Sequence, residues 1–183
     1  MKNLFVVLSL MIACGANAQL YRVKKDASTI SFHSKTSMED IDAVNKNPNG
    51  AIKAETGDVQ FVVTMTSFKF KAALMEEHFN ENYMESTKYP QGTFKGKLNE
   101  KLDLTKDGEN KVTVTGKMTM HGVTKDATME GTITKKGTEL IVKSGFKVKL
   151  TDYDIKVPTV VTAKIAEIID VDVDCVMEPF EKK

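Results

Sequence analysis

The residue types most often used for chemistry are few and widely separated in this chain. His33, His78 and His121 lie far apart, and no pair of them has the spacing that metal ligands usually show. Cys175 lies in an alternating apolar segment, where a buried core thiol is expected rather than a reactive one. The sequence contains no Gly-x-Ser-x-Gly motif and no glycine-rich phosphate loop. It therefore predicts a protein that is not an enzyme and holds no metal or other cofactor.

The dominant pattern is an alternation of apolar and polar residues. In residues 111–120 (KVTVTGKMTM), valine, glycine and methionine occupy one face of a strand, and lysine and threonine occupy the other. Residues 140–150 and 171–177 repeat the same period of two. Because the sequence offers no second apolar layer, we expect a sheet that closes around its own interior, with the function inside it.

Turn residues divide the chain at intervals that suit an antiparallel meander. Gly, Pro, Asn or Asp cluster at residues 47–50, 89–92, 106–109, 121–122 and 136–137. The segments between these turns predict eight strands, at residues 29–36, 52–54, 58–66, 93–98, 111–120, 125–134, 139–150 and 170–177. The expected fold class is all-β, an antiparallel eight-stranded barrel. Barrels of this size either fill their interior with side chains or enclose one small ligand.

One segment interrupts the alternation. Residues 71–86 place apolar side chains at three- and four-residue spacing, namely Leu74, Met75, Phe79 and Tyr83. This spacing predicts an inserted amphipathic helix, whose apolar stripe must cover an open end or side of the barrel. It is either a lid that completes the core or a gate over a ligand cavity. A second short helix is expected at residues 160–167.

The residues on the apolar faces leave open whether the interior is full. Several inward positions are small, namely Gly96, Gly116, Gly131 and Ser144. Together with adaptable methionine, such positions suit a cavity for a long flexible apolar guest. The alternative is that these glycines relieve strain at the corners of the barrel. The residues expected to line a cavity are Phe61, Val63, Phe79, Tyr83, Phe94, Val112, Val114, Met118, Met120, Met129, Phe146 and Val148.

The first eighteen residues have the three parts of a secretory signal peptide. Lys2 precedes an apolar run at residues 4–12, and Ala16-Asn17-Ala18 provides a cleavage site. We expect an exported, periplasmic protein that begins at Gln19. The alternative is cleavage before Cys14 and lipidation of that cysteine, although methionine stands where lipoprotein signals usually have leucine.

Removal of this segment leaves residues 19–183, a length that suits a single domain. Lys2 is the only charged residue removed, so 25 basic and 25 acidic side chains remain. This balance gives no electrostatic reason to expect a nucleic-acid partner.

Two segments carry a resemblance to a known family. Residues 78–98 (HFNENYMESTKYPQGTFKGKL) and 116–133 (GKMTMHGVTKDATMEGTI) are similar to the YceI family of exported polyisoprenoid-binding proteins. The resemblance extends more loosely over nearly all of residues 19–183. It implies an elongated lipocalin-like barrel whose apolar tunnel holds an isoprenoid chain. It also implies that His121 shapes a turn. The region 38–50 departs from the family pattern and is expected to be short, polar and irregular.

Two functional hypotheses follow. The first is non-catalytic binding, storage or transport of a long-chain isoprenoid, of the quinone or polyprenyl type, or a similar amphiphile, with transient membrane contact. The second is a packed barrel that serves as an interaction or stress-protective module and binds a protein partner. A homodimer is compatible with both hypotheses.

Overall fold

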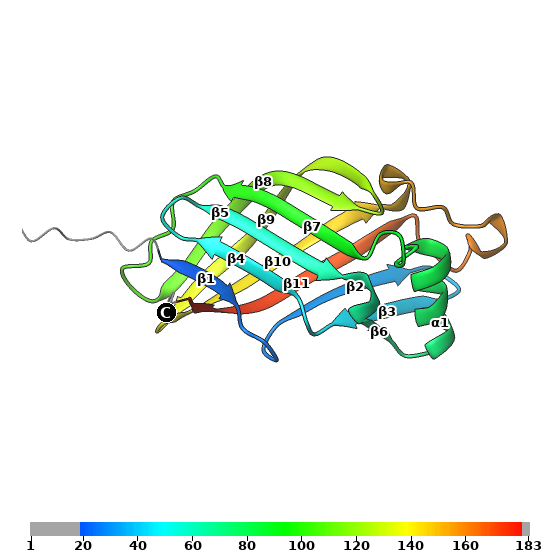
Figure 1. Ribbon diagram of the computed structural model, residues 1–183, viewed down its shortest axis with the longest axis horizontal. Helices are drawn as coiled ribbons and strands as arrows, with labels where there is room; N and C mark the ends of the chain where they lie inside the picture. Colours follow the sequence, from blue (N-terminus) through cyan, green and yellow to red (C-terminus); the bar gives the residue numbers. More distant parts are fainter. Residues whose placement is uncertain (1–18, 181–183) are drawn as a thin grey trace, which may run out of the picture.

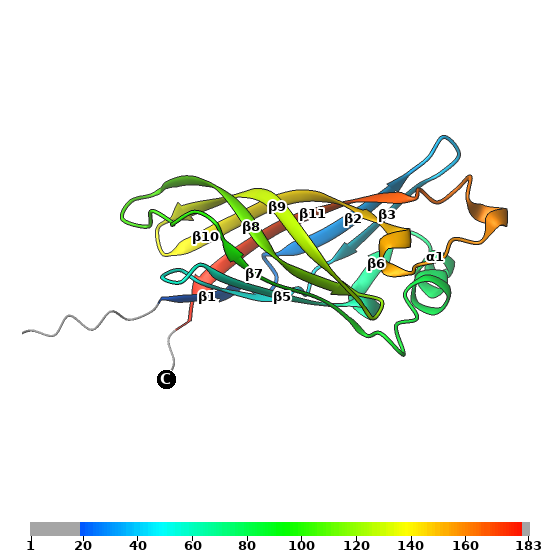
Figure 2. The same cartoon turned by 90° about the horizontal axis from the view of Figure 1, so that it is seen from above.

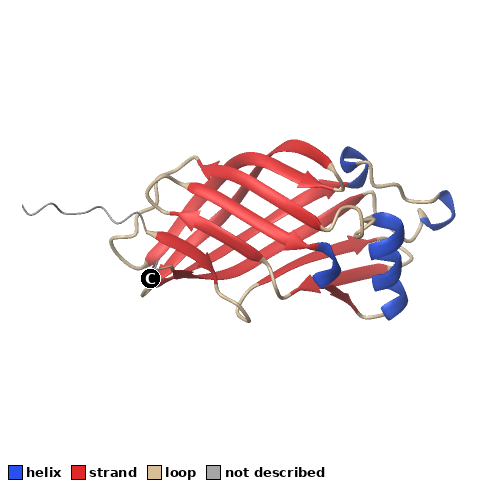
Figure 3. Ribbon diagram, viewed as in Figure 1, coloured by secondary structure: helices blue, strands red, loops and turns tan. Residues whose placement is uncertain are grey.

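The computed structural model describes residues 19–180, so the predicted signal peptide and its alternative lipidation site lie outside the described residues. Within this range the chain forms an elongated β-barrel (Figure 1). The helical segments gather at one end of the barrel (Figure 3). The strands are β1 (Leu20–Val23), β2 (Thr29–Lys35), β3 (Asp40–Asn45), β4 (Asn49–Lys53), β5 (Asp58–Thr64), β6 (Phe68–Phe70), β7 (Gln91–Leu98), β8 (Gly108–Met120), β9 (Val123–Lys136), β10 (Glu139–Lys149) and β11 (Ile168–Pro179). The helical segments are η1 (Met65–Ser67), α1 (Ala73–His78), η2 (Phe79–Tyr83), η3 (Leu150–Tyr153) and η4 (Thr159–Val161).

Eight strands form a closed antiparallel ring. Their order is β1-β4-β5-β7-β8-β9-β10-β11, and β11 pairs again with β1, where Tyr21 lies opposite Pro179. The remaining strands, β2, β3 and β6, extend this ring toward the end that carries α1 (Figure 1). The predicted eight-stranded barrel is therefore confirmed, with three extra strands.

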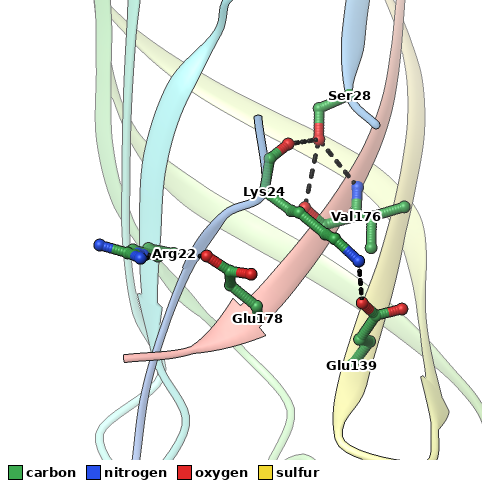
Figure 4. A network of polar contacts seen from close by, with 6 residues as sticks. All are labelled: Arg22, Lys24, Ser28, Glu139, Val176 and Glu178. Carbon is green, nitrogen blue, oxygen red and sulfur yellow. Dashed lines mark hydrogen bonds and ion pairs between the residues drawn. The ribbon is translucent and has the colours of Figure 1, made fainter. Parts of the chain in front are cut away.

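The extra strands arise because three long strands are each broken once, into β1 and β2, β3 and β4, and β5 and β6. β1 and β2 lie along the same edge of β11 and are separated by a short loop. Ser28 stabilises this break, since its Oγ donates toward carbonyl oxygens of Lys24 and Val176 and accepts from the Val176 N–H at 3.0 Å (Figure 4). On the outer surface nearby, Lys24 pairs with Glu139 at 2.6 Å and Arg22 with Glu178 at 3.1 Å (Figure 4).

The period of two seen in the sequence corresponds to inward and outward faces. Cross-strand pairs such as Phe94 with Met118 and Val114 with Met129 place apolar side chains on the same inward face. Outward positions carry Lys–Asp pairs between β10 and β11, for example Lys143 with Asp174 at 3.0 Å. The exposed pairs contribute little to stability, so burial of the inward face is the main stabilising term.

The apolar interior consists of two clusters along the barrel axis. The first surrounds Tyr21, Ile133 and Leu140, each at most 1 % exposed, and fills the end near β1. Leu102 and Leu104 of the loop after β7 pack against it. The second cluster lies beneath the helical segments. Phe61, Met118 and Val142 contact both clusters and mark the waist between them.

The wall of the barrel opens at two places near the helical end. β6 pairs with β3 but not with β7, and the segment α1–η2 follows β6 at this gap. The pairing between β9 and β10 stops at Gly131 and Ser144. On its other side β9 stays paired with β8 as far as Val123, and β10 stays paired with β11 as far as Lys149. The two strands therefore separate from each other while each keeps its other neighbour. Figure 2 shows β9 and β10 separating toward the end with α1. The helical segments therefore lie where the ladder of backbone hydrogen bonds is incomplete.

The local predictions differ from the structure in three respects. Residues 40–45 form strand β3, where an irregular segment was expected, and β1 and β6 were not predicted. The helix expected at residues 71–86 is shorter, because α1 ends at His78 and continues as the π-helical turn η2. In place of a helix at residues 160–167 there is the single 3-10 turn η4.

Candidate functional site: an apolar cavity under a helical lid

A cavity of about 530 Å³ runs along the interior of the barrel. This volume lies within the range of protein pockets that enclose one small molecule, roughly 300–1,000 Å³. Apolar side chains from both clusters make up most of its lining, from Ile52 and Ile133 near one end to Phe79 and Leu150 near the other. The interior is therefore not packed solid.

All twelve side chains predicted to line a cavity do line it. Phe61 and Val63 come from β5, Phe94 from β7, and the two valines and two methionines from β8. Met129 lies on β9, and Phe146 and Val148 lie on β10. Phe79 and Tyr83 reach the cavity from η2. Their contact with a ligand stays a prediction.

Further lining residues lie on β2, β3 and β6, outside the predicted set. Ile30 and Phe32 of β2, Ile41 of β3, and Phe68 and Phe70 of β6 all contribute. A period-two signal was present in each of these segments, since the apolar residues alternate with polar ones. β3 and β6 are short, however, and a few alternating residues carry little weight.

The helical lid, residues 73–90, is anchored by an aromatic cluster. The Phe79 ring stacks on Phe32 of β2 with centroids 5.4 Å apart and meets Phe70 of β6 at 5.1 Å. Phe32 also contacts Phe68 at 5.2 Å. No side chain of α1 is buried, so Phe79 and the buried Met84 provide most of the apolar anchoring of this segment. The lid is fixed at its centre and less firmly at α1.

A second attachment holds the C-terminal part of the lid. His121 lies in the turn between β8 and β9, where it and Gly122 both have positive φ, as a two-residue hairpin turn of this kind requires. Its ring hydrogen-bonds the Glu85 carboxylate through Nε2 at 2.7 Å and the Tyr153 carbonyl oxygen through Nδ1 at 3.0 Å. Tyr89 packs edge-on against the same ring, with centroids 4.7 Å apart. His121 thus joins the lid to η3 as well as shaping its turn.

The mouth of the cavity lies at the end with α1. It is bordered by the start of β3 and the residue before it, by the lid, and by η4 and the segment after it. The lining residues there are Glu39, Ile41, Leu74, Met75, His78, Val161, Lys164 and Ile165. Leu74 lines the cavity and yet is 60 % exposed, so this border is open to solvent. His78 is exposed and also lines the cavity at this border.

The small residues on the apolar faces have a structural role. A Cβ on Gly116 would lie 2.3 Å from the Lys95 carbonyl oxygen, and one on Gly131 would lie 2.4 Å from that of Lys143. A Cβ on Gly96 would meet the Thr115 carbonyl oxygen at 2.7 Å. These glycines allow neighbouring strands to approach closely, as the strain alternative predicts. Gly131 and Ser144 also line the cavity, whereas Gly96 and Gly116 do not.

The one thiol among residues 19–180 is buried. Cys175 is 0 % exposed on the inward face of β11, and burial raises its pKa to about 11. Burial also raises the pKa of the Tyr83 phenol, which lines the cavity.

Among residues 19–180, no three His, Cys, Asp or Glu side chains are placed to hold a metal ion. The part of the chain that the structure describes contains no helix with the length and apolar character to cross a membrane.

Comparison with known proteins identifies relatives of the whole barrel. The model of the YceI-like domain matches residues 21–177. Protein YceI of Shigella flexneri is 31 % identical over 105 residues, which cover 54 % of this chain and 52 % of that protein. UPF0312 protein VPA0850 of Vibrio parahaemolyticus is also 31 % identical, over 106 residues that cover 54 % and 53 %. The chain spans about half the length of the curated relatives it matches.

Two solved structures share the fold. A polyisoprenoid binding domain from Saccharophagus degradans, implicated in plant cell wall breakdown, superposes with a TM-score of 0.76 at 18 % identity. The match covers 87 % of this chain and 98 % of that one. BcnA of Burkholderia cenocepacia superposes with a TM-score of 0.72 at 19 % identity, over 84 % and 98 % of the two chains.

Proposed function

Because the chain belongs to the YceI-like family, we propose that it binds a long-chain isoprenoid, or a similar amphiphile, in the barrel cavity. The observation that carries the proposal is the continuous apolar lining of the 530 Å³ cavity beneath a lid. The structural similarity to a polyisoprenoid binding domain supports the same class of ligand. The proposed mechanism is enclosure and release of the tail, without chemistry.

The energetics favour recognition of the tail. Burial of one five-carbon isoprene unit contributes roughly 3–4 kcal/mol at about 0.8 kcal/mol per carbon. A few units therefore offset the entropy lost on association, which is on the order of 4–15 kcal/mol. A quinone and a polyprenyl lipid of equal length would share this contribution, so the tail alone does not identify the head group.

Transport would require contact with a membrane, and the surface near the mouth suits it. Met38, in the turn between β2 and β3, is 65 % exposed, and Ile168 at the start of β11 is also exposed, as is Leu74 on the lid. All three lie on segments at the helical end of the barrel (Figure 1). We propose that this end touches the bilayer while the ligand passes. Sedimentation with vesicles of neutral lipid, compared between the wild type and Leu74→Ser, tests this contact.

We also propose that the protein is exported to the periplasm. Intact mass measurement of the secreted protein distinguishes cleavage before Gln19 from lipidation of Cys14. Self-association into a homodimer stays a prediction, which analytical ultracentrifugation of the same material checks.

Native mass spectrometry of the protein expressed with its own leader tests ligand binding directly. We expect a stoichiometric adduct that organic extraction releases as a quinone or polyprenyl lipid. Val142→Trp, which places a large ring at the waist of the cavity, should lose the adduct, and Met118→Trp should do the same. Thr128→Trp, on the exposed outward face of β9, is the matched control and should keep it. Absence of any adduct, even after isoprenoids of several lengths are supplied, would favour the hypothesis of a protein-binding module.

A further inference from the structure

The mouth of the apolar cavity contains a small set of polar side chains. Ser34 of β2, Glu39 before β3, His78 of α1 and Lys164 after η4 all line the cavity at this end. The Ser34 Oγ accepts a hydrogen bond from the Ala166 N–H at 2.9 Å, which leaves its own proton to donate. Glu39 and Lys164 are the groups at the mouth with opposite charges that a ligand's head group can meet, and His78 adds a ring nitrogen.

Glu39 and Lys164 are arranged as an inner and an outer charge. Glu39 continues the inward-facing series of β3, which includes Ile41 and the buried Ala43. Its carboxylate lies 3.8 Å from the Lys164 ammonium, which is too long for a hydrogen bond. The Glu39 side chain is 29 % exposed and that of Lys164 is 54 % exposed. A head group at the mouth thus meets the carboxylate on the cavity side and the ammonium on the solvent side.

Two further lysines at this end of the barrel lie in ion pairs with carboxylates. Lys71 pairs with Asp42 at 3.3 Å, and Lys149 pairs with Glu167 at 3.2 Å. The exposed Glu77 of α1 and Glu81 of η2 add negative charge.

Arginine, the side chain best suited to bind phosphate, is absent from this end of the described barrel. The single arginine of the sequence, Arg22, lies on β1 at the opposite end and pairs with Glu178 (Figures 1 and 4).

We infer that Glu39 and Lys164 select an uncharged head group with acceptor oxygens, and that they disfavour phosphates. The inference rests on the proposed binding of an isoprenoid tail. A carbonyl or hydroxyl oxygen can accept from the Lys164 ammonium, and His78 offers a ring nitrogen from across the mouth. A phosphate would place its charge beside the Glu39 carboxylate, in a partly desolvated site where like charges repel strongly.

The experiment compares three ligands with the same tail and different heads: a polyprenol, a prenyl quinone and a polyprenyl monophosphate. Affinities are measured by fluorescence displacement at low ionic strength, because salt screens the effect. The wild type is expected to bind the alcohol and the quinone at least about tenfold more tightly than the phosphate, given the like-charge penalty. Glu39→Gln should reduce this difference by strengthening phosphate binding, with no change for the alcohol.

Two further variants make the result specific. Glu77→Gln makes the same change of charge on the exposed face of α1, outside the cavity lining, and should strengthen phosphate binding much less than Glu39→Gln does, because water screens an exposed carboxylate. Lys164→Gln leaves Glu39 unopposed and should weaken phosphate binding further. Thermal unfolding of each variant verifies that the fold is retained.

The outcomes separate this inference from the proposed function. If all three ligands bind the wild type equally and Glu39→Gln matches Glu77→Gln, the tail is bound but the head-group selection is wrong. If none of the three ligands binds, the proposed function itself is wrong and the inference is overturned with it.

Discussion

The Nε2 atom of His121 lies 2.7 Å from a carboxylate oxygen of Glu85, thirty-six residues earlier in the chain. The other ring nitrogen faces the Tyr153 carbonyl oxygen, which is also an acceptor. A doubly protonated ring satisfies both oxygens, whereas a neutral ring satisfies only one. Glu85, His121 and nearby Asp154 all have positive φ, so three residues with an uncommon backbone conformation meet at this junction.

Loss of this junction should loosen the lid. Glu85→Asn removes the contact with His121 and keeps a residue that tolerates positive φ. We expect a loss of about 1 kcal/mol in the free energy of unfolding, the usual contribution of a partly exposed charge-assisted hydrogen bond. Hydrogen exchange should accelerate in residues 84–90 and bound lipid should leave faster. Glu81→Gln, on the exposed side of η2, is the control. Unchanged exchange in Glu85→Asn would show that the aromatic cluster alone holds the lid.

Phe79→Ala should detach the centre of the lid. The Phe79 ring contacts Phe32, Phe68 and Phe70, so its removal leaves a void among three aromatic side chains. Because the ring is only partly buried, we expect a destabilisation of about 2 kcal/mol, below the range for a fully buried phenylalanine. Urea denaturation measures this change, and limited proteolysis reports cleavage within residues 72–90. Phe180→Ala, at the opposite end, should cost much less. Equal effects of the two substitutions would contradict the proposed anchoring.

Gly116→Ala should destabilise the barrel although it adds only one methyl group. That group would lie 2.3 Å from the Lys95 carbonyl oxygen and 2.4 Å from the Gly96 Cα, so the backbones of β7 and β8 would have to separate. A cost of about 1–3 kcal/mol is typical of such overpacking. At Gly145 a Cβ meets only a carboxylate oxygen of Asp172, at 3.3 Å, so Gly145→Ala is the matched control. A midpoint of denaturation that is the same for both variants would show that the wall tolerates the methyl group.

Cys175 should resist thiol reagents in the folded state. Its thiol is 0 % exposed, and burial raises its pKa to about 11. The folded protein therefore keeps a proton that the unfolded chain releases near pH 9, and the associated stability is present at neutral pH and lost as the pH rises toward 11. Reaction with a colorimetric disulfide reagent at pH 8 should be slow until denaturant is added. Rapid reaction of the folded protein would mean that β11 readily separates from its neighbouring strands.

The long strands could be predicted from the sequence because each has many alternating residues. β8, β10 and β11 are each at least eleven residues long, so a period of two is distinct and the inward set can be identified. β3 has six residues, among them aspartate and asparagine, which are uncommon in strands, and β6 has only three residues. In both segments the alternation is too short to predict a strand. The barrel continues through them because pairing with neighbouring strands outweighs weak local preference.

The interactions of the lid and the mouth could not be predicted in the same way. The partners of His121 lie 36 and 32 residues away in the chain, and Lys164 meets Glu39 across the opening. Such contacts depend on where loops of a closed barrel end in space, which a repeating pattern does not specify. The family resemblance predicted the fold, and the histidine turn that it implied is present with an added role.

The pairing of β1 with β11 also has a consequence for how the protein folds. Tyr21 and Pro179 are neighbours in the closed ring although 157 residues lie between them, so the ring closes through one of the least local contacts in the chain. Contacts of this kind form late and slowly, because a long loop must be ordered first. Until then β1 and β11 expose unpaired edges, so a chaperone that shields these strands would speed productive folding more than one that acts on the local β8–β9 hairpin.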